Sequence, residues 1–168
     1  MTKLHTQTAA QSHNVSNGVE REDRQALSAL LGKALASTYV LYHKTHAFHW
    51  NVIGPMFYSI HQLTDAQYKD LAGAIDDIAE RIRAIGFRTP TGLSRYVKES
   101  CVADETDVHD AAAMVEQLAS DHLAVAVQLR DAVKEAETRD DVYTADLLTA
   151  RIGVHEEAAW MLRALIAQ

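Results

Sequence analysis

Hydrophobic residues recur every three or four positions along most of the chain, which is the spacing of one face of an α-helix. Gly54 and Pro55 interrupt the first stripe, and Gly86 stands where the second stripe stops. A shorter segment after Pro90 and Gly92 has room for about one short helix. The predicted helices cover residues 23–50, 57–85, 93–99, 108–136 and 148–166.

Four long helices with a longer crossover between the second and the third predict an all-α protein, a ferritin-like four-helix bundle with a short extra helix in the crossover. The chain has 168 residues, 48% of them hydrophobic, and only two prolines, which suits one domain built from long helices. Residues 1–19 are mostly polar and carry one formally charged side chain, Lys3. We therefore expect a flexible N-terminal tail over 1–20 and the bundle domain over 21–168.

The charge balance narrows the choice of partners. Sixteen Lys and Arg against 23 Asp and Glu give a formal charge of −7, which disfavours a nucleic-acid-binding face and favours attraction of cations. The single cysteine, Cys101, excludes a disulfide framework and a cysteine-based metal site. The sequence shows neither a bilayer-spanning run nor a secretion signal, so we expect a cytoplasmic protein with no membrane partner.

Five residues carry the candidate chemistry: His49, His61, Asp65, Asp76 and Glu80. On the second helix the three carboxylates fall within roughly 100° of His61, because each residue advances about 100°. That face is separate from the Ile stripe. The non-functional alternative is that these are solvated polar residues on a helix surface, and their spacing alone leaves both interpretations open.

Distance divides this polar face into two halves. His61 and Glu80 are 19 positions apart, nearly 30 Å at ~1.5 Å per residue, so one ion cannot bind to both. A two-fold dimer with antiparallel second helices would bring His61 and Asp65 of one chain to Asp76 and Glu80 of the other. His49 would join the histidine half, and mixed imidazole and carboxylate ligands suit Fe(II).

The segment His49-Trp50-Asn51-Val52-Ile53-Gly54-Pro55-Met56-Phe57, followed by the polar face and Ala79-Glu80-Arg81, resembles the motif of the Dps family, the mini-ferritins known as DNA-binding proteins from starved cells. The resemblance covers the chain from about Asp23 to its end. It implies a hollow dodecamer with ferroxidase centres at two-fold interfaces. His49, His61 and Asp65 would come from one subunit, and Asp76 and Glu80 from its neighbour. The family oxidises Fe(II), commonly with hydrogen peroxide, and stores ferric mineral inside the shell.

Several further residues are weighed against ordinary structural roles. Trp50 is a candidate electron donor near the centre, or an aromatic interface anchor. Asp140, Asp141 and Asp146 are candidates for an acidic iron-entry pore through the resemblance, with helix capping as the alternative. His122 and His155 lie on apolar stripes, where hydrogen-bonded core histidines are expected. The chain has no Glu-x-x-His motif, which argues against an intrasubunit di-iron centre.

The expected cofactor is iron, and the sequence leaves open whether zinc takes one position. An alternative function is a nucleoid-associated protein that protects DNA mainly by direct, non-specific binding. The predicted tail is poor in lysine, whereas phosphate contacts supply most non-specific affinity for DNA. We therefore expect iron sequestration in a homo-oligomer that protects DNA from oxidative damage, with only weak DNA binding.

Overall fold

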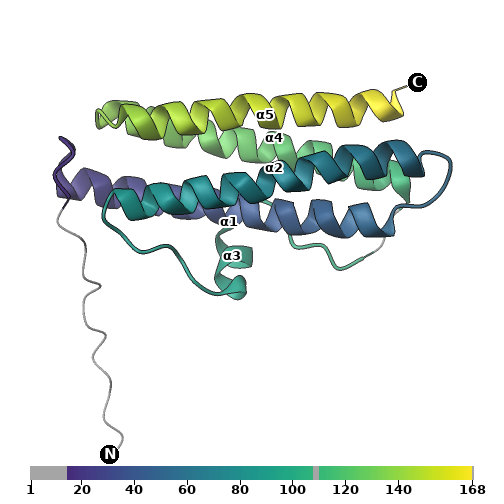
Figure 1. Ribbon diagram of the computed structural model, residues 1–168, viewed down its shortest axis with the longest axis horizontal. Helices are drawn as coiled ribbons and strands as arrows, with labels where there is room; N and C mark the ends of the chain where they lie inside the picture. The colour runs from purple at the N-terminus through teal and green to yellow at the C-terminus, as the bar shows by residue number, and fades with distance from the viewer. Residues whose placement is uncertain (1–14, 108–109, 168) are drawn as a thin grey trace, which may run out of the picture.

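The computed structural model describes residues 15–107 and 110–167, and over these residues it is all-helical. The helices are α1 Arg21–Asn51, α2 Phe57–Ala84, α3 Leu93–Glu99, α4 Ala111–Thr138 and α5 Val142–Ile166. Figure 1 shows α1 beside α2 and α4 beside α5, with α3 lying outside the bundle next to α1. The predicted ferritin-like bundle, with its short helix in the crossover, is confirmed.

The predicted tail lies mostly outside the described residues, which begin at residue 15. α1 begins at Arg21. The division into a tail over 1–20 and a domain over 21–168 stays a prediction.

Two helices end with the same hydrogen-bond pattern at residues of positive φ. After α2, Gly86 (φ 96°) donates its N–H to the Arg83 carbonyl at 3.0 Å, and Phe87 donates to Ile82 at 3.1 Å. This is the Schellman pattern, and the predicted stop at Gly86 is present. After α4, Asp140 (φ 54°) takes the equivalent position, where glycine is the usual residue.

The start of α5 differs from the sequence expectation. Asp141 caps the helix by accepting a hydrogen bond from the Thr144 N–H at 3.1 Å, so α5 begins at Val142, six residues before the stripe at 148. Val142 and Tyr143 are exposed, so the first turn carries apolar side chains that do not belong to the core stripe. α4 begins at Ala111 with Asp110 as its cap, and Val108 of the predicted stripe lies outside the described residues.

The core is a continuous layer of aliphatic side chains between the two helix pairs, and the predicted stripes supply most of it. Phe57 and Ala112 are exceptions, because both are exposed. The largest fully buried side chains are Leu27, Leu31, Leu35, Leu41, Ile60, Leu71, Ile78, Ile82, Ile85, Met114, Leu118 and Leu129. None of the described helices has the length and apolar character needed to cross a membrane.

A buried histidine pair joins α4 to α5 within this core. The Nδ1 atoms of His122 and His155 lie 2.9 Å apart, as expected for hydrogen-bonded core histidines. Burial, together with the nearby Arg151 guanidinium, lowers the pKa of His122 to about 4. Burial and the neighbouring His122 lower the pKa of His155 to about 2. Both rings are therefore neutral at pH 7.

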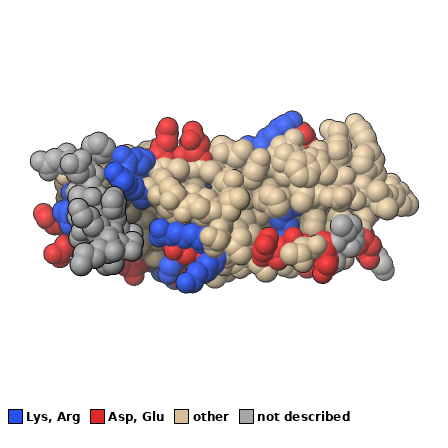
Figure 2. Space-filling model, turned by 90° about the horizontal axis from the view of Figure 1, so that it is seen from below, with Lys and Arg blue, Asp and Glu red and all other residues tan. Residues whose placement is uncertain are grey.

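The surface near the turn between α1 and α2 is apolar. Trp50, Ile53, Phe57 and Tyr58 are 62%, 81%, 43% and 72% exposed. Figure 2, which views the α3 side of the molecule, shows uncharged surface at the end toward this turn, with charged side chains along its edges. We call these four residues the apolar patch. Exposed apolar surface of this kind marks an interaction site.

Candidate metal centre

The end of α1 and the start of α2 bring His49 and His61 into contact. The chain reverses through residues 52–56, where Gly54 adopts a φ of 100° that favours glycine. The two imidazole rings stack with their centroids 3.7 Å apart and an interplanar angle of 18°. His49 Nδ1 lies 3.0 Å from the His61 carbonyl oxygen, and His61 Nδ1 lies 3.0 Å from the His49 carbonyl oxygen.

These reciprocal hydrogen bonds fix the tautomer of both rings. A carbonyl oxygen can only accept a hydrogen bond, so each Nδ1 carries a proton, and in the neutral ring Nε2 then has the lone pair. Metal-binding histidines commonly hold the ring in this way, with the other nitrogen donating to a backbone carbonyl or a carboxylate. His49 is buried and His61 half-buried, so the pair is fixed in place beside the surface.

Asp65 lies one helical turn after His61 and completes what we call the histidine half-site: His49, His61 and Asp65. Its Oδ1 accepts a hydrogen bond from the Tyr68 hydroxyl at 2.9 Å, and its Oδ2 accepts one from Lys69 Nζ at 2.7 Å. The hydrogen bonds from Lys69 and then Tyr68 lower the pKa of Asp65, which keeps the carboxylate ionised. Sequence reasoning missed both partners, although their spacings of three and four residues on one helix are a recognisable signal.

A second layer of rings covers the histidine half-site. His46 stacks on Tyr68 with centroids 4.0 Å apart, and the Trp50 ring lies 4.1 Å from His46. Burial, followed by the nearby His49 and His43, lowers the pKa of His46 and favours its neutral form. Trp50 therefore approaches the half-site through His46, a residue that the sequence analysis did not select.

Asp76 and Glu80 form the carboxylate half-site, at the far end of α2. Both are exposed, and because α2 is one continuous helix, Asp76 lies about 16 Å along its axis from Asp65. Glu80 borders an open cleft with Arg81 and Tyr143. Within residues 15–107 and 110–167 of one chain, no three His, Cys, Asp or Glu side chains gather as metal ligands. One chain therefore presents two separate half-sites in its described part.

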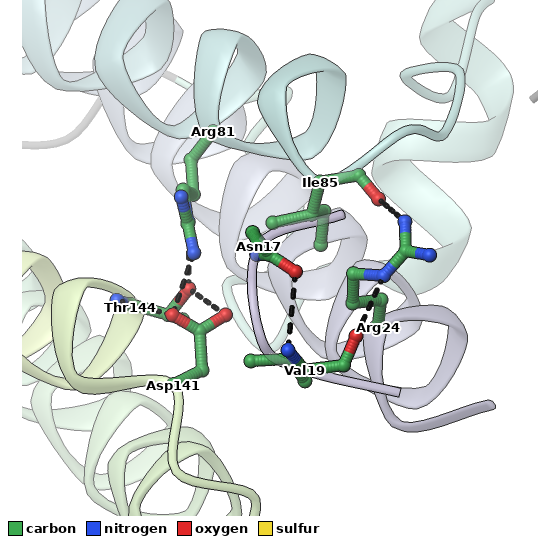
Figure 3. Close-up of polar contacts among 7 residues, drawn as sticks. All are labelled: Asn17, Val19, Arg24, Arg81, Ile85, Asp141 and Thr144. Carbon is green, nitrogen blue, oxygen red and sulfur yellow. Dashed lines mark hydrogen bonds and ion pairs between the residues drawn. The ribbon is translucent and has the colours of Figure 1, made fainter. Parts of the chain in front are cut away.

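Next to Glu80, Arg81 joins α2 to the start of α5 (Figure 3). Its guanidinium donates to Asp141 Oδ1 at 2.6 Å and to the Thr144 hydroxyl at 2.8 Å. Burial acts to raise the pKa of Asp141, but the hydrogen bonds from Arg81 and Thr144 outweigh it and leave this pKa lowered. In the same view, Arg24 donates to the carbonyl of Ile85 at the end of α2. These contacts fix the end of α2 that carries the carboxylate half-site.

The three aspartates of the predicted pore fall in different environments. Asp141 is 3% exposed and serves as a cap and an ion-pair partner, which is the structural alternative for this residue. Asp140 ends α4 and does not cap α5. Asp140 and Asp146 are exposed and line one shallow cleft with Glu137. Iron entry at these residues stays a prediction.

Comparison with known proteins shows which proteins this chain is similar to. Residues 28–168 match the ferritin-like domain. DNA protection during starvation protein 2 of Bacillus anthracis is 37% identical over 139 residues, which cover 83% of this chain and 95% of that protein.

Two solved structures superpose closely. A Dps protein from Bacillus brevis is 34% identical with a TM-score of 0.83, over 87% of this chain and 98% of its own. A Dps protein from Vibrio cholerae, a member of a broad superfamily of ferritin-like diiron-carboxylate proteins, is 29% identical with a TM-score of 0.86, over 95% and 99%. The fold and the domain match define a ferritin-like protein. Within that class, the chain belongs to the Dps family.

Proposed function

We propose that this protein oxidises Fe(II) at centres formed between two subunits and stores the ferric product, thereby protecting DNA. The observation that carries the proposal is the reciprocal Nδ1 hydrogen bonding of His49 and His61, which leaves the Nε2 of each neutral ring available to a metal, with Asp65 one helical turn after His61. The Vibrio cholerae structure belongs to a diiron-carboxylate superfamily, and the Bacillus anthracis relative is a DNA protection protein. Both descriptions agree with an iron substrate and a protective role.

The separation of the half-sites supports a centre shared by two chains. Antiparallel packing of α2 against its copy brings the histidine half-site of one chain to the carboxylate half-site of the other, and symmetry creates two centres. The apolar patch adjoins the histidine half-site, because Trp50 follows His49 and Phe57 stacks on His61 at 5.0 Å. Burial of this patch would contribute to the stability of such a dimer.

The ligand set suits oxidation of iron. Carboxylates from both half-sites hold Fe(II) and stabilise the additional charge of Fe(III), while neutral imidazoles bind without adding charge. Hydrogen peroxide is the proposed oxidant: two Fe(II), one peroxide and two protons give two Fe(III) and two waters. This route takes both electrons from iron and releases no hydroxyl radical. Iron is thus the proposed metal, and zinc in one position stays a prediction.

The family resemblance further implies a dodecameric shell that holds the ferric mineral, with iron entering near Asp146 and Asp140. Size measurement coupled to an iron titration tests this by giving the subunit number and the ions bound per subunit. Protection by iron removal, rather than by coating, predicts that DNA retention in a gel-shift assay disappears at moderate salt. Retention that survives moderate salt would instead support the nucleoid-associated alternative.

A complementation experiment tests the shared centre. One variant carries His49→Ala with His61→Ala, and the other carries Asp76→Asn with Glu80→Gln. Each variant alone is expected to oxidise Fe(II) with peroxide slowly, because every centre lacks one half. When the two variants are co-expressed, each mixed pair regains one whole centre, because the intact halves come from different chains.

Recovered Fe(II) oxidation in the co-expressed protein, above the value for either variant, is the expected result. A centre formed within one chain would show no recovery, because each chain would keep its own defect. His43→Ala, at an exposed position on α1, serves as the control for changes outside the half-sites.

A further inference from the structure

Aromatic rings continue away from the histidine half-site along α1. Tyr68 lies 6.4 Å from Tyr42, Tyr42 lies 6.1 Å from Tyr39, and Tyr39 lies 5.0 Å from Tyr96 of α3, measured between ring centroids. Tyr39 and Tyr42 are one helical turn apart on α1, so they lie on the same face. All four rings are half-buried. They form an unbroken series that starts at the histidine half-site and ends on α3.

The first ring of this series is tied directly to a candidate iron ligand. The Tyr68 hydroxyl donates to Asp65 Oδ1 at 2.9 Å, and the Tyr68 ring lies 5.2 Å from that of His49. A phenol that loses an electron becomes a very strong acid, so it can give up its electron readily only if a base accepts its proton. Asp65 is within hydrogen-bond reach of that proton. Tyr68 is therefore placed both to receive oxidising equivalents from the centre and to release its proton.

We propose that Tyr68, Tyr42, Tyr39 and Tyr96 form a one-electron relay, which supplies an electron to the centre when only one Fe(II) is bound and carries the oxidised site away from the iron. This inference rests on the proposed function, because it needs Fe(II) and hydrogen peroxide at the histidine half-site. The relay acts on the one-electron reaction of peroxide, which two bound irons avoid. A single Fe(II) gives peroxide one electron, and without a second donor the product is a hydroxyl radical.

The relay supplies that second electron in a balanced step. One Fe(II), one Tyr68 phenol, one hydrogen peroxide and one proton give one Fe(III), one tyrosyl radical and two waters. The peroxide O–O bond breaks, iron and tyrosine each lose one electron, and the phenolic proton leaves along the hydrogen bond to Asp65. The radical then passes to Tyr42 and onward as each next tyrosine is oxidised in turn. Peroxide is the only oxidant that the step requires.

Trp50 is the competing donor, since its ring reaches the same half-site through His46. Trp50 is 62% exposed, whereas each ring of the tyrosine series is more protected from solvent. The two donors differ in a measurable way, because tryptophanyl and tyrosyl radicals have different hyperfine patterns. The proposed relay predicts the tyrosyl pattern.

Freeze-quench electron paramagnetic resonance on the whole assembled protein tests the relay. Anaerobic protein is given one Fe(II) per subunit and mixed with an equimolar amount of hydrogen peroxide. The expected result is an organic radical whose hyperfine splitting changes when ring-deuterated tyrosine is incorporated. Absence of a radical, or a radical that ring-deuterated tyrosine does not affect, would overturn the proposal.

Two variants locate the radical. Tyr68→Phe keeps the ring and removes the hydroxyl, and we expect loss of the tyrosyl signal when yield is expressed per Fe(III) formed. Tyr42→Phe leaves the Tyr68–Asp65 contact in place, so the radical stays on Tyr68, next to Fe(III), and relaxes faster than in the unaltered protein. Tyr143→Phe is the matched control: the same change at a 62% exposed position on α5, outside the tyrosine series and the apolar patch, which should leave the signal unchanged. Loss of the signal in this control alone would contradict the assignment.

The same samples separate failure of the relay from failure of the proposed function. Ferric absorbance is followed in parallel with two Fe(II) per subunit. If peroxide oxidises no iron in the unaltered protein, the proposed ferroxidase function is wrong. If iron is oxidised normally and no tyrosyl radical forms with one Fe(II) per subunit, only the relay is wrong.

Discussion

Two histidine pairs in this bundle both form hydrogen bonds through Nδ1, but they differ in which ring nitrogens carry a proton. His49 and His61 each donate Nδ1–H to the other's backbone carbonyl, so in the neutral rings both Nε2 atoms have lone pairs. His122 and His155 bond Nδ1 to Nδ1, so only one of these two atoms can carry the proton. In the neutral buried pair, one Nε2 therefore has a lone pair and the other carries a hydrogen.

The carboxylates near the two pairs also differ. Asp65, beside the first pair, is hydrogen-bonded by Tyr68 and Lys69 at a partly exposed position. Asp70, the carboxylate that acts on His122, is held through both oxygens by Arg151 at 3.0 and 2.7 Å. A histidine pair thus becomes a candidate metal site when backbone acceptors leave the Nε2 of both neutral rings free to bind and a carboxylate follows one turn later on the same helix.

Iron oxidation gives the largest expected difference between the pairs. His49→Ala with His61→Ala should lower the initial rate of Fe(II) oxidation by peroxide by about 10- to 100-fold, since both imidazole ligands are lost. His122→Leu with His155→Leu should keep the rate, because the second pair is buried away from the half-sites. Stopped-flow absorbance of the ferric product measures both, after circular dichroism has shown that each variant is folded. Equal rates of Fe(II) oxidation in the two double variants would mean that the two histidine pairs do not differ in their role in iron oxidation.

Stability at acid pH should show the opposite pattern: the buried pair, His122 and His155, should affect it more than His49 and His61. The folded-state pKa of His122, about 4, lies below the ordinary value of 6.5, so the unfolded chain binds protons first as the pH falls. Stability is therefore present above pH 6.5 and is lost between pH 6.5 and pH 4. For His122 alone, the loss between pH 7 and pH 5 is about 2 kcal/mol.

Urea unfolding at pH 7 and pH 5 measures this effect. His122→Leu with His155→Leu should lose less stability over that interval than the unaltered protein, because the protons that the unfolded chain takes up at these positions are gone. His43→Ala is the control, because His43 is exposed. An unchanged pH dependence in the double variant would show that other groups cause the acid sensitivity.

The helices were predictable because most of their apolar residues face one core. The break at Gly54 and the stop at Gly86 follow from backbone conformations that only a few residue types adopt readily. The start of α5 was missed for a physical reason. Val142 and Tyr143 are apolar but exposed, so they contribute nothing to the stripe, and the helix start depends on the Asp141 cap.

Four of the five candidate ligands were proposed from their spacing on one helix, and His49 was added from the preceding helix, whereas their surroundings depend on how α1 packs against α2. The carbonyl partners of His49 and His61 exist only once the two helices are paired. His46 contacts Tyr68 for the same reason, and hydrophobic periodicity alone carries no information about that contact. The sequence therefore provided the candidate ligands, which stay a prediction, while their tautomers and second contacts required the tertiary structure.

The smallest expected effect concerns the ion pair between Lys69 and Asp65. Lys69 Nζ lies 2.7 Å from Asp65 Oδ2, and the lysine side chain is 64% exposed, so the pair itself is weak. Lys69→Met removes a positive charge near the incoming Fe(II) and frees one carboxylate oxygen. We expect Fe(II) affinity to rise about two- to fivefold, the range of an exposed ion pair.

Lys134→Met gives a matched control for Lys69→Met. Lys134 pairs with Asp131 on α4, and both side chains are about three-quarters exposed, so the change removes a similar surface ion pair away from the half-sites. Anaerobic Fe(II) titration by calorimetry compares the two variants. Tighter binding in Lys69→Met alone would show that Lys69 competes with iron for Asp65. Equal affinities would mean that Asp65 binds iron through Oδ1 or contributes little, and Tyr68 would then become the contact that limits access to this carboxylate.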